Sequence, residues 1–256
     1  KFGCGIAPSW HYAGGFGCHL GPRQKSPQRG DGTRMTEAEA KEWLTTSLGV
    51  SRETMESLDA FVAYLKRESA SQNLIAASTV DDIWSRHIVD SAQLLTFMDQ
   101  SQPETKCLDL GSGAGFPGLI IALLTDFEVT LVESRARRIE YLQRAVEMLD
   151  IGGRVTVMGM PLERMTTAPF SLISARAFAP LPKLFELAAR FSHNNTLWLL
   201  PKGRNAAAEW DDVKTVWDGA FSVKQSITDV DAGILVGTLA GKRTGGGNAG
   251  AKGQKP

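Results

Sequence analysis

The chain has 256 residues, of which 43% are apolar, and its 28 basic side chains balance 28 acidic ones. This length supports one sizeable hydrophobic core with a small accessory element. No run approaches the roughly 18 apolar residues that cross a membrane, and no signal-peptide apolar core is present, so we expect a cytoplasmic protein that has no membrane partner.

The two ends differ in composition from the centre. Residues 1–34 are rich in Gly and Pro and carry five Lys or Arg and one Asp, and residues 241–256 carry four Lys or Arg and no acid. We predict that both ends are disordered and that residues 1–34 are a disordered or non-native tail. The centre is therefore acidic, with 19 basic and 27 acidic residues. A nucleic acid would have to be bound by a local basic patch.

The three cysteines do not predict a disulfide framework or a metal site. Two of them lie in the N-terminal tail, and Cys107 lies in a predicted strand. A metal site made of Cys4, His11, Cys18 and His19 is an alternative, but the Cys-x₂₋₄-Cys spacing of structural zinc sites is missing. We expect no metal.

Residues 35–103 are predicted to form a small N-terminal helical cap. Thr36 and Glu39 form a capping box before a first helix that ends at Gly49. Ser51 caps a second helix with an apolar stripe at helical spacing. A third helix is expected to begin at Thr79 and to extend to Met98.

A glycine-rich loop follows the next predicted strand, and the rest of the chain is organised around it. The sequence Leu108-Asp109-Leu110-Gly111-Ser112-Gly113-Ala114-Gly115-Phe116-Pro117-Gly118 indicates strand, tight loop and helix, with Pro117 at the first helical position. A dinucleotide fingerprint would need glycine where Phe116 stands, and the Gly-Lys-Ser/Thr end of a P-loop is absent. The spacing favours the Gly-x-Gly-x-Gly loop of methyltransferases that use S-adenosylmethionine (SAM).

From residue 104 to residue 240 strands and helices alternate, which predicts an α/β fold with a mostly parallel sheet and helices on both faces. The predicted strands after the first are 127–132, 154–158, 170–174 and 196–200, with helices near 134–149, 161–165, 181–191 and 206–217. Two last strands, 220–227 and 233–240, are joined by a connection too short for a crossover. The predicted fold is therefore a Rossmann-like class I SAM-dependent methyltransferase domain ending in an antiparallel hairpin.

Ligands of such sheets bind beyond the carboxyl ends of the strands. Glu133 ends the second strand, where it can accept hydrogen bonds from ribose hydroxyls or cap the next helix. Asp109 is expected to anchor the loop backbone or the amino-acid end of SAM. Leu162 and Glu163 follow the third strand, where adenine would lie. The predicted cofactor-binding residues are Asp109, Gly111, Gly113, Gly115, Phe116, Glu133, Ser134, Leu162, Glu163 and Arg176.

The fourth strand is followed by Arg176-Ala177-Phe178 and lacks the Asn-Pro-Pro-Tyr-type motif that holds an exocyclic amino group. No cysteine lies there as a nucleophile for pyrimidine C5. The methyl acceptor should therefore be an atom that needs neither the Asn-Pro-Pro-Tyr-type motif nor a cysteine nucleophile.

Four motifs together resemble a known family. They are Trp84-Ser85-Arg86-His87-Ile88-Val89-Asp90-Ser91, the glycine loop through Gly118, Ser174-Ala175-Arg176-Ala177-Phe178, and Pro201-Lys202-Gly203. This combination closely resembles RsmG, also called glucose-inhibited division protein B, the bacterial 16S rRNA guanine-N7 methyltransferases. The resemblance extends from about residue 51 to residue 240. It implies SAM contacts at Gly111, Phe116, Leu162, Glu163 and Arg176.

The resemblance also implies the substrate, which is 16S ribosomal RNA or the small ribosomal subunit, and S-adenosylhomocysteine as the product. Guanine N7 carries a lone pair and no proton at neutral pH, so no general base is expected. We also expect the protein to be a monomer. Candidate positioning residues are Arg86, His87 and Lys202, although His87 can also be a structural histidine. The candidate RNA-binding residues are Arg135, Arg137, Arg138 and Arg204. Two other functions remain open: a small-molecule or protein methyltransferase, and a SAM-binding module without catalysis.

Overall fold

The computed structural model describes residues 34–98, 100 and 105–243. These residues all belong to one compact unit. Most of the predicted disordered tails, and the alternative metal site in the N-terminal one, lie outside the described residues. Within the described ranges, no cluster of His, Cys, Asp and Glu could hold a metal ion, and no helix is both long enough and apolar enough to cross a membrane.

The first helix begins and ends where the sequence predicts, and the second begins where it predicts. Helix α1 (Glu37–Leu48) has the complete Thr36–Glu39 capping box, and Gly49 closes it in the left-handed conformation with φ 65°. Helix α2 (Arg52–Ser69) is capped by Ser51, whose hydroxyl accepts from the Thr54 backbone N–H. Both helices bury their apolar stripes in one hydrophobic cluster, which they share with helices of the sheet domain.

The third predicted helix was wrong in its start and in its type. A short 3₁₀ turn, η1 (Ala77–Thr79), ends where the helix was expected to begin. The helical stretch begins later as a π-helix, η2 (Trp84–Val89), and continues through α3 (Asp90–Ala92) and the 3₁₀ segment η3 (Gln93–Phe97). Apolar spacing does not distinguish these hydrogen-bond patterns, and π-helical turns occur often at functional sites.

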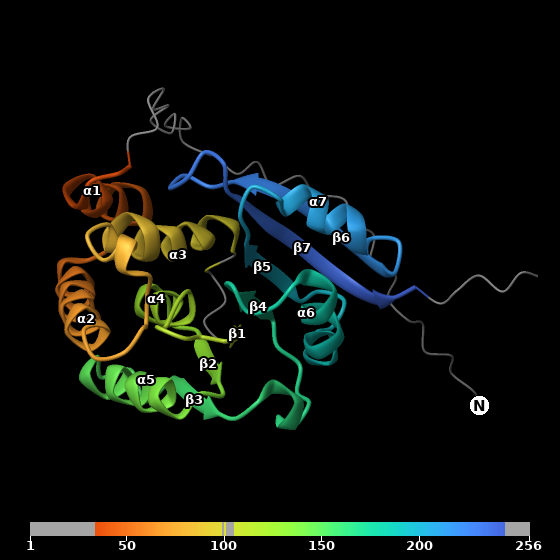
Figure 1. Cartoon of the computed structure of the whole chain (residues 1–256), viewed down its shortest axis with the longest axis horizontal. Helices are drawn as coiled ribbons and strands as arrows, with labels where there is room; N and C mark the ends of the chain where they lie inside the picture. Colours follow the sequence, from red (N-terminus) through yellow and green to blue (C-terminus); the bar gives the residue numbers. More distant parts are fainter. Residues whose placement is uncertain (1–33, 99, 101–104, 244–256) are drawn as a thin grey trace, which may run out of the picture. The chain divides into compact units, whose positions relative to one another are not determined.

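Seven strands form one mixed sheet in the order β3-β2-β1-β4-β5-β7-β6 (Figure 1). The strands are β1 (Lys106–Leu110), β2 (Glu128–Glu133), β3 (Val155–Gly159), β4 (Leu172–Ala175), β5 (Leu197–Pro201), β6 (Trp217–Gln225) and β7 (Gly233–Lys242). The first five pair in parallel, and β7 is antiparallel to both β5 and β6. The predicted α/β sheet with a terminal antiparallel hairpin is confirmed.

Helices cover both faces of this sheet. On one face lie α4 (Gly118–Leu124) and α5 (Ala136–Met148) together with the N-terminal helices. On the other lie α6 (Leu181–Ala188), α7 (Ala206–Val213) and the 3₁₀ turns η4 (Leu162–Arg164) and η5 (Ala189–Phe191). Figure 1 shows the two groups on opposite sides. Pro117 is the N-cap of α4, one residue before the predicted position.

The end of the chain contains two further corrections. The predicted helix 206–217 ends at Val213, and Trp217 instead begins β6. Trp217 is buried against Phe185, with ring centroids 5.5 Å apart, so packing on α6 decides its conformation. Strand β7 reaches Lys242, so residues 241 and 242, which were predicted to be disordered, pair with β6.

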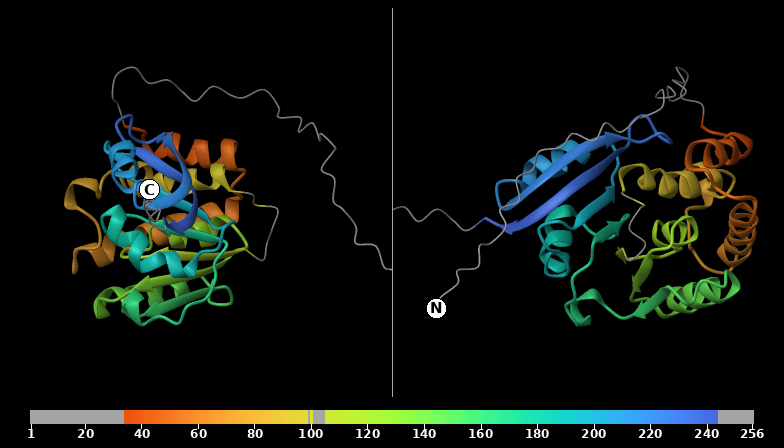
Figure 2. Two further views of the ribbon diagram at one scale, coloured as in Figure 1. Left: turned by 90° about the vertical axis from the view of Figure 1, so that its right-hand side faces the viewer. Right: turned by 180° about the vertical axis from the view of Figure 1, so that it is seen from behind.

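The connection between β6 and β7 is held against the helical stretch that contains η2 and α3 (Figure 2). The Gln93 side chain donates to Ser226 Oγ at 3.1 Å and accepts from the Ile227 backbone N–H at 2.9 Å. The Thr228 hydroxyl donates to Asp90 at 2.8 Å. These bonds join segments more than 130 residues apart and build one wall of the site described next.

Candidate functional site

Asp109 lies at the carboxyl end of β1, directly before the glycine loop, and is fully buried. The Ser174 hydroxyl donates to its Oδ1 at 2.7 Å, while Oδ2 has no hydrogen-bond partner among the described residues. Burial raises the pKa of this carboxyl. A buried acceptor without a partner is costly, which indicates that a ligand or an ordered water completes it.

Glu133 ties the glycine loop to the start of α5. Its Oε2 accepts from the Gly113 backbone N–H at 3.1 Å, and its Oε1 accepts from the backbone N–H groups of Ser134 and Arg135 at 2.8 and 2.9 Å. A carboxylate has about four acceptor sites, so roughly one remains for a ligand. Glu133 therefore fixes the loop first and can make a single bond to a sugar hydroxyl.

A small cavity of about 300 Å³ lies beside Gly111 and Glu133. Leu162 and Phe178 also line it, and an ideal Cβ at Gly111 would lie 2.6 Å from Phe178 Cδ2, so only glycine allows this approach. Gly111 also has φ 66°, which favours glycine. Seven predicted residues line this cavity: Gly111, Glu133, Ser134, Arg135, Arg138, Leu162 and Glu163.

Three side chains stack beneath the loop and link it to η2. His87 stacks on Phe116 with ring centroids 5.0 Å apart, and the Arg176 guanidinium lies 5.0 Å from the same phenyl centroid. Arg176 Nη2 lies 3.0 Å from His87 Nδ1, and Thr79 Oγ1 lies 2.9 Å from Nε2.

Arginine can only donate, so Nδ1 is the acceptor and the proton of the neutral ring must be on Nε2. Nε2 then donates to Thr79, whose hydroxyl donates to the Ala76 carbonyl at 2.8 Å. Burial, and then the charges of Arg176 and Arg86, lower the pKa of His87 to about 3. Both ring nitrogens are therefore occupied, and His87 orients Arg176 as a neutral group.

We expect this histidine to give the protein a dependence of stability on acid. The unfolded histidine binds a proton below pH 6.5, whereas the folded one stays neutral down to about pH 3. As the pH falls from 6.5 to about 3, this group should lower the free energy of unfolding by about 1.4 kcal/mol per pH unit. Above pH 6.5 its stabilising contribution is fully present. Denaturant unfolding at several pH values should show a shallower slope for His87→Asn. The exposed His193→Asn is the control, and an unchanged slope in His87→Asn would contradict the assignment.

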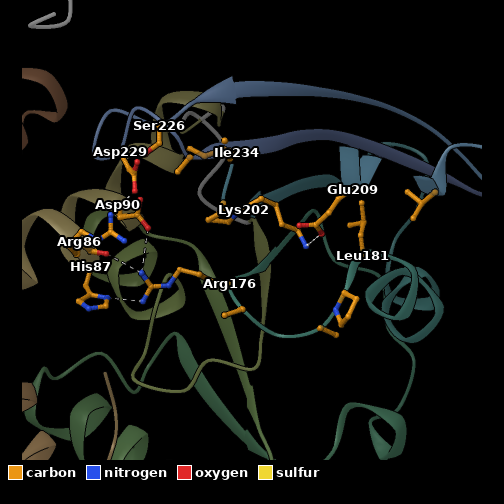
Figure 3. Close-up of a pocket in the computed structure, with 18 of the residues that line it drawn as sticks. Arg86, His87, Asp90, Arg176, Leu181, Lys202, Glu209, Ser226, Asp229 and Ile234 are labelled. Atoms are coloured by element: carbon orange, nitrogen blue, oxygen red, sulfur yellow. Dashed lines mark hydrogen bonds and ion pairs between the residues drawn. The ribbon is translucent and has the colours of Figure 1, made fainter. Parts of the chain in front are cut away.

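A larger cavity of about 720 Å³ lies on the other side of Ala177 and is lined by Arg176 (Figure 3). One wall carries Arg86, whose Nη1 lies 2.8 Å from Asp229 Oδ2, and Asp90, whose Oδ2 lies 3.4 Å from Arg176 Nη1. The opposite wall carries Lys202, whose Nζ lies 2.8 Å from Glu209 Oε2. Ala177, which both cavities share, has φ 53°, a strained value of the kind that clusters at ligand sites.

The structure thus separates the predicted residues into three groups. Arg86, His87, Arg176 and Lys202 line the large cavity. Six line neither of these cavities: Asp109, Gly113, Gly115, Phe116, Arg137 and Arg204. Of the cations predicted to bind RNA, Arg138 is tethered to the Asn73 carbonyl at 3.2 Å, while Arg135, Arg137 and Arg204 are exposed.

Four carboxylates of the large cavity were missed. Asp90 stands inside the Arg-His-x-x-Asp-Ser motif, which was a usable signal. Asp229 lies in the short β6–β7 connection, and Glu209 and Asp212 lie on α7, whose sequence pattern marks no site. Only the fold brings the last three to the cavity.

Comparison with known proteins adds independent findings. A family model described as GidB, rRNA small subunit methyltransferase G, matches residues 54–234. A protein of Zymomonas mobilis named ribosomal RNA small subunit methyltransferase G is 53% identical over 211 residues, which cover 80% of this chain and 94% of that protein. A protein of the same name from Rhizorhabdus wittichii is 51% identical over 222 residues, 86% of this chain and 98% of its own length.

Solved structures agree on the fold. A putative O-methyltransferase from Klebsiella pneumoniae superposes with a TM-score of 0.55 at 16% identity, covering 80% of this chain and 98% of that one. An O-methyltransferase from Bacillus cereus, solved in complex with S-adenosylhomocysteine, has a TM-score of 0.52 at 14% identity with the same coverage. At such identities the likeness concerns the architecture alone.

Proposed function

The chain belongs to the GidB family of small-subunit rRNA methyltransferases, and from this membership we propose that it transfers the methyl group of SAM to N7 of a guanine in 16S ribosomal RNA. One observation of the structure carries the proposal furthest. A small cavity beside the glycine loop and a large cavity lined with charged groups meet at Ala177, and Arg176 lines the large one. A methyl donor in the small cavity and a nucleobase in the large cavity would face each other there.

The residues around the small cavity fit SAM. Glu133 keeps about one free acceptor site for a ribose hydroxyl, and the buried Leu162 offers an apolar surface for adenine. Asp109 is fully buried and lines neither cavity, so of its two predicted roles it suits the support of the glycine loop from behind. SAM supplies an electrophilic methyl on a sulfonium. The chain's residues hold and orient it, and the predicted contacts at Gly111, Phe116, Glu163 and Arg176 remain part of this proposal.

Transfer to N7 needs positioning and no proton removal. Guanine N7 has an available lone pair, and orientation alone can supply roughly 7–11 kcal/mol of a barrier. His87 has both ring nitrogens in hydrogen bonds, and its lowered pKa keeps it neutral. It therefore suits a role in orienting Arg176, and Arg86 and Lys202 are placed to bind the acceptor.

We further propose that the enzyme works as a monomer in the cytoplasm, with residues 35–103 as a cap and residues 104–240 as the SAM-dependent domain.

The test of the function is direct. Small subunits and naked 16S rRNA from a strain lacking the gene are treated with purified protein and labelled SAM, and nuclease digestion with mass mapping locates the product. New 7-methylguanine supports the proposal. Label on protein or small molecules only, or SAM binding without turnover, would support the other two functions.

The exposed arginines Arg135 and Arg137 are proposed to bind RNA phosphates. Replacing both with glutamine should weaken binding of 16S rRNA at low salt and reduce the slope of log affinity against log salt by about 0.7–0.9 for each phosphate that is no longer neutralised. Filter binding across a salt series measures this slope. Arg52→Gln changes an exposed arginine of α2 that pairs with Glu56, and it is the control. Equal slopes for all the variants would remove these residues from the RNA-binding surface.

A further inference from the structure

Lys202 and Glu209 form a fixed pair on one wall of the large cavity (Figure 3). The Lys202 side chain is 12% exposed and that of Glu209 is 34% exposed, and Nζ lies 2.8 Å from Oε2. The backbone also holds both residues in place. Lys202 N–H donates to the Gly233 carbonyl at 2.8 Å, and Glu209 N–H donates to the Asn205 carbonyl at 2.9 Å within α7.

The pair still has hydrogen-bonding capacity toward the cavity. An ammonium has three donors and a carboxylate about four acceptor sites. Within the described part of the chain, the one hydrogen bond of each charged group is the bond to the other. A partly exposed ion pair of this kind contributes little to stability, so stability does not explain why a lysine this far buried lines the cavity.

An ammonium donor beside a carboxylate with two acceptor oxygens is complementary to one nucleobase edge. The Watson–Crick edge of guanine presents O6, which accepts, then N1–H and the 2-amino group, which donate. Adenine presents an amino donor and an N1 acceptor in the first two positions, which would face the lysine and the carboxylate with the wrong polarity. A site whose buried polar groups are left unpaired rejects a substrate strongly.

We propose that Lys202 and Glu209 select guanine as the methyl acceptor, with Lys202 Nζ donating to O6 and the Glu209 carboxylate accepting from N1–H and the 2-amino group. This inference rests on the proposed function and assigns to Glu209 a role in specificity. It identifies the bound group as an unstacked guanine, which a single-stranded or looped RNA presents at low cost.

The topology gives the base a consistent orientation. Strands β4 and β5 are neighbours, so Arg176 and Lys202, the residues that follow them, lie along the same edge of the sheet. Glu209 lies in α7, on the side of Lys202 that is away from Arg176 (Figure 3). In guanine, O6 and N7 lie on the same side of the ring system, and the 2-amino group lies on the other. With O6 at Lys202, N7 is directed toward Arg176 and the adjacent Ala177, which both cavities share.

The first experiment uses wild-type protein and changes the substrate. The methylated guanine is located by mapping, and small subunits are then reconstituted with inosine at that position, which removes only the 2-amino group. We expect kcat/KM to fall by about tenfold to a hundredfold. Equal rates on guanine and inosine would overturn the inference while leaving the proposed function intact.

The second experiment changes the protein. Glu209→Gln replaces an acceptor by an amide donor, so turnover on guanine should fall by about tenfold or more, and the ratio between guanine and inosine should approach one. SAM affinity by calorimetry and the melting temperature should stay near wild type. Glu186→Gln, which changes an exposed carboxylate of α6 that pairs with Lys242, is the matched control.

The outcomes separate the two levels of the proposal. An unchanged guanine-to-inosine ratio in Glu209→Gln overturns the inference alone, because a merely structural role would lower both rates equally. Absence of 7-methylguanine with wild-type protein overturns both the inference and the proposed function. A collapsed ratio with normal SAM affinity supports both.

Discussion

Replacing Arg176 with leucine is expected to lower methyl transfer by about a hundredfold or more, since small displacements at a reacting centre have effects of that size. The guanidinium lines the large cavity beside Ala177, the residue that both cavities share. It lies over Phe116, donates to His87 Nδ1 at 3.0 Å, and has Nη1 within 3.4 Å of Asp90 Oδ2. Leucine cannot make any of these interactions and leaves Asp90 without its cation.

Single-turnover methylation of small subunits at saturating SAM measures the effect, with calorimetry for SAM affinity. Arg176→Lys retains the charge but lacks the planar fork, so it should recover only part of the rate. Arg144→Leu, which removes an exposed arginine of α5 paired with Glu140, is the control. Turnover at the wild-type rate in Arg176→Leu would show that Arg176 does not position the reactants.

Gly118→Ala is expected to lower both stability and SAM affinity. Gly118 begins α4 where that helix presses on two strands. An ideal Cβ there would lie 2.4 Å from Leu131 Cδ2 and 2.7 Å from Asp109 Oδ2, so the carboxylate and the β2 side chain must move. Overpacking of this kind costs about 1–3 kcal/mol. The displaced Asp109 should also weaken SAM binding.

Denaturant unfolding and calorimetry measure the two effects. Gly153→Ala is the matched control, because an ideal Cβ at that position meets no atom within 4 Å. The control should keep wild-type stability and affinity. If Gly118→Ala behaves like the control, the close approach of α4 to Asp109 does not limit either property.

The sequence predicted the fold well where local rules and packing agree. The Thr36–Glu39 capping box, the glycine loop and the parallel order of strands followed by a hairpin are all present in the structure. Errors occurred where tertiary contacts override local pattern. Trp217 fits a helical period, yet it begins β6 because its ring is buried against Phe185.

The site was less predictable than the fold, for a physical reason. Residues of the cofactor side follow one another in short motifs, so spacing alone indicates Gly111 and Glu133. The acceptor side depends on long-range pairs such as Arg86 with Asp229, which lie 143 positions apart. An arginine in a helix has no local feature that predicts such a distant partner. Glu209 was missed for the same reason, since only the placement of α7 beside β7 brings it to Lys202.

The bonds between the β6–β7 connection and the stretch around Asp90 and Gln93 also determine when the large cavity can form during synthesis of the chain. Synthesis proceeds from the N-terminus, and folding accompanies it. The residues proposed to hold SAM are all present once the chain has reached Phe178. The large cavity also needs Lys202, Glu209 and Asp229, and its last lining residue is Ile234. A growing chain therefore carries its cofactor residues and the wall with Arg86 before it has the wall with Lys202, and the hairpin completes the large cavity.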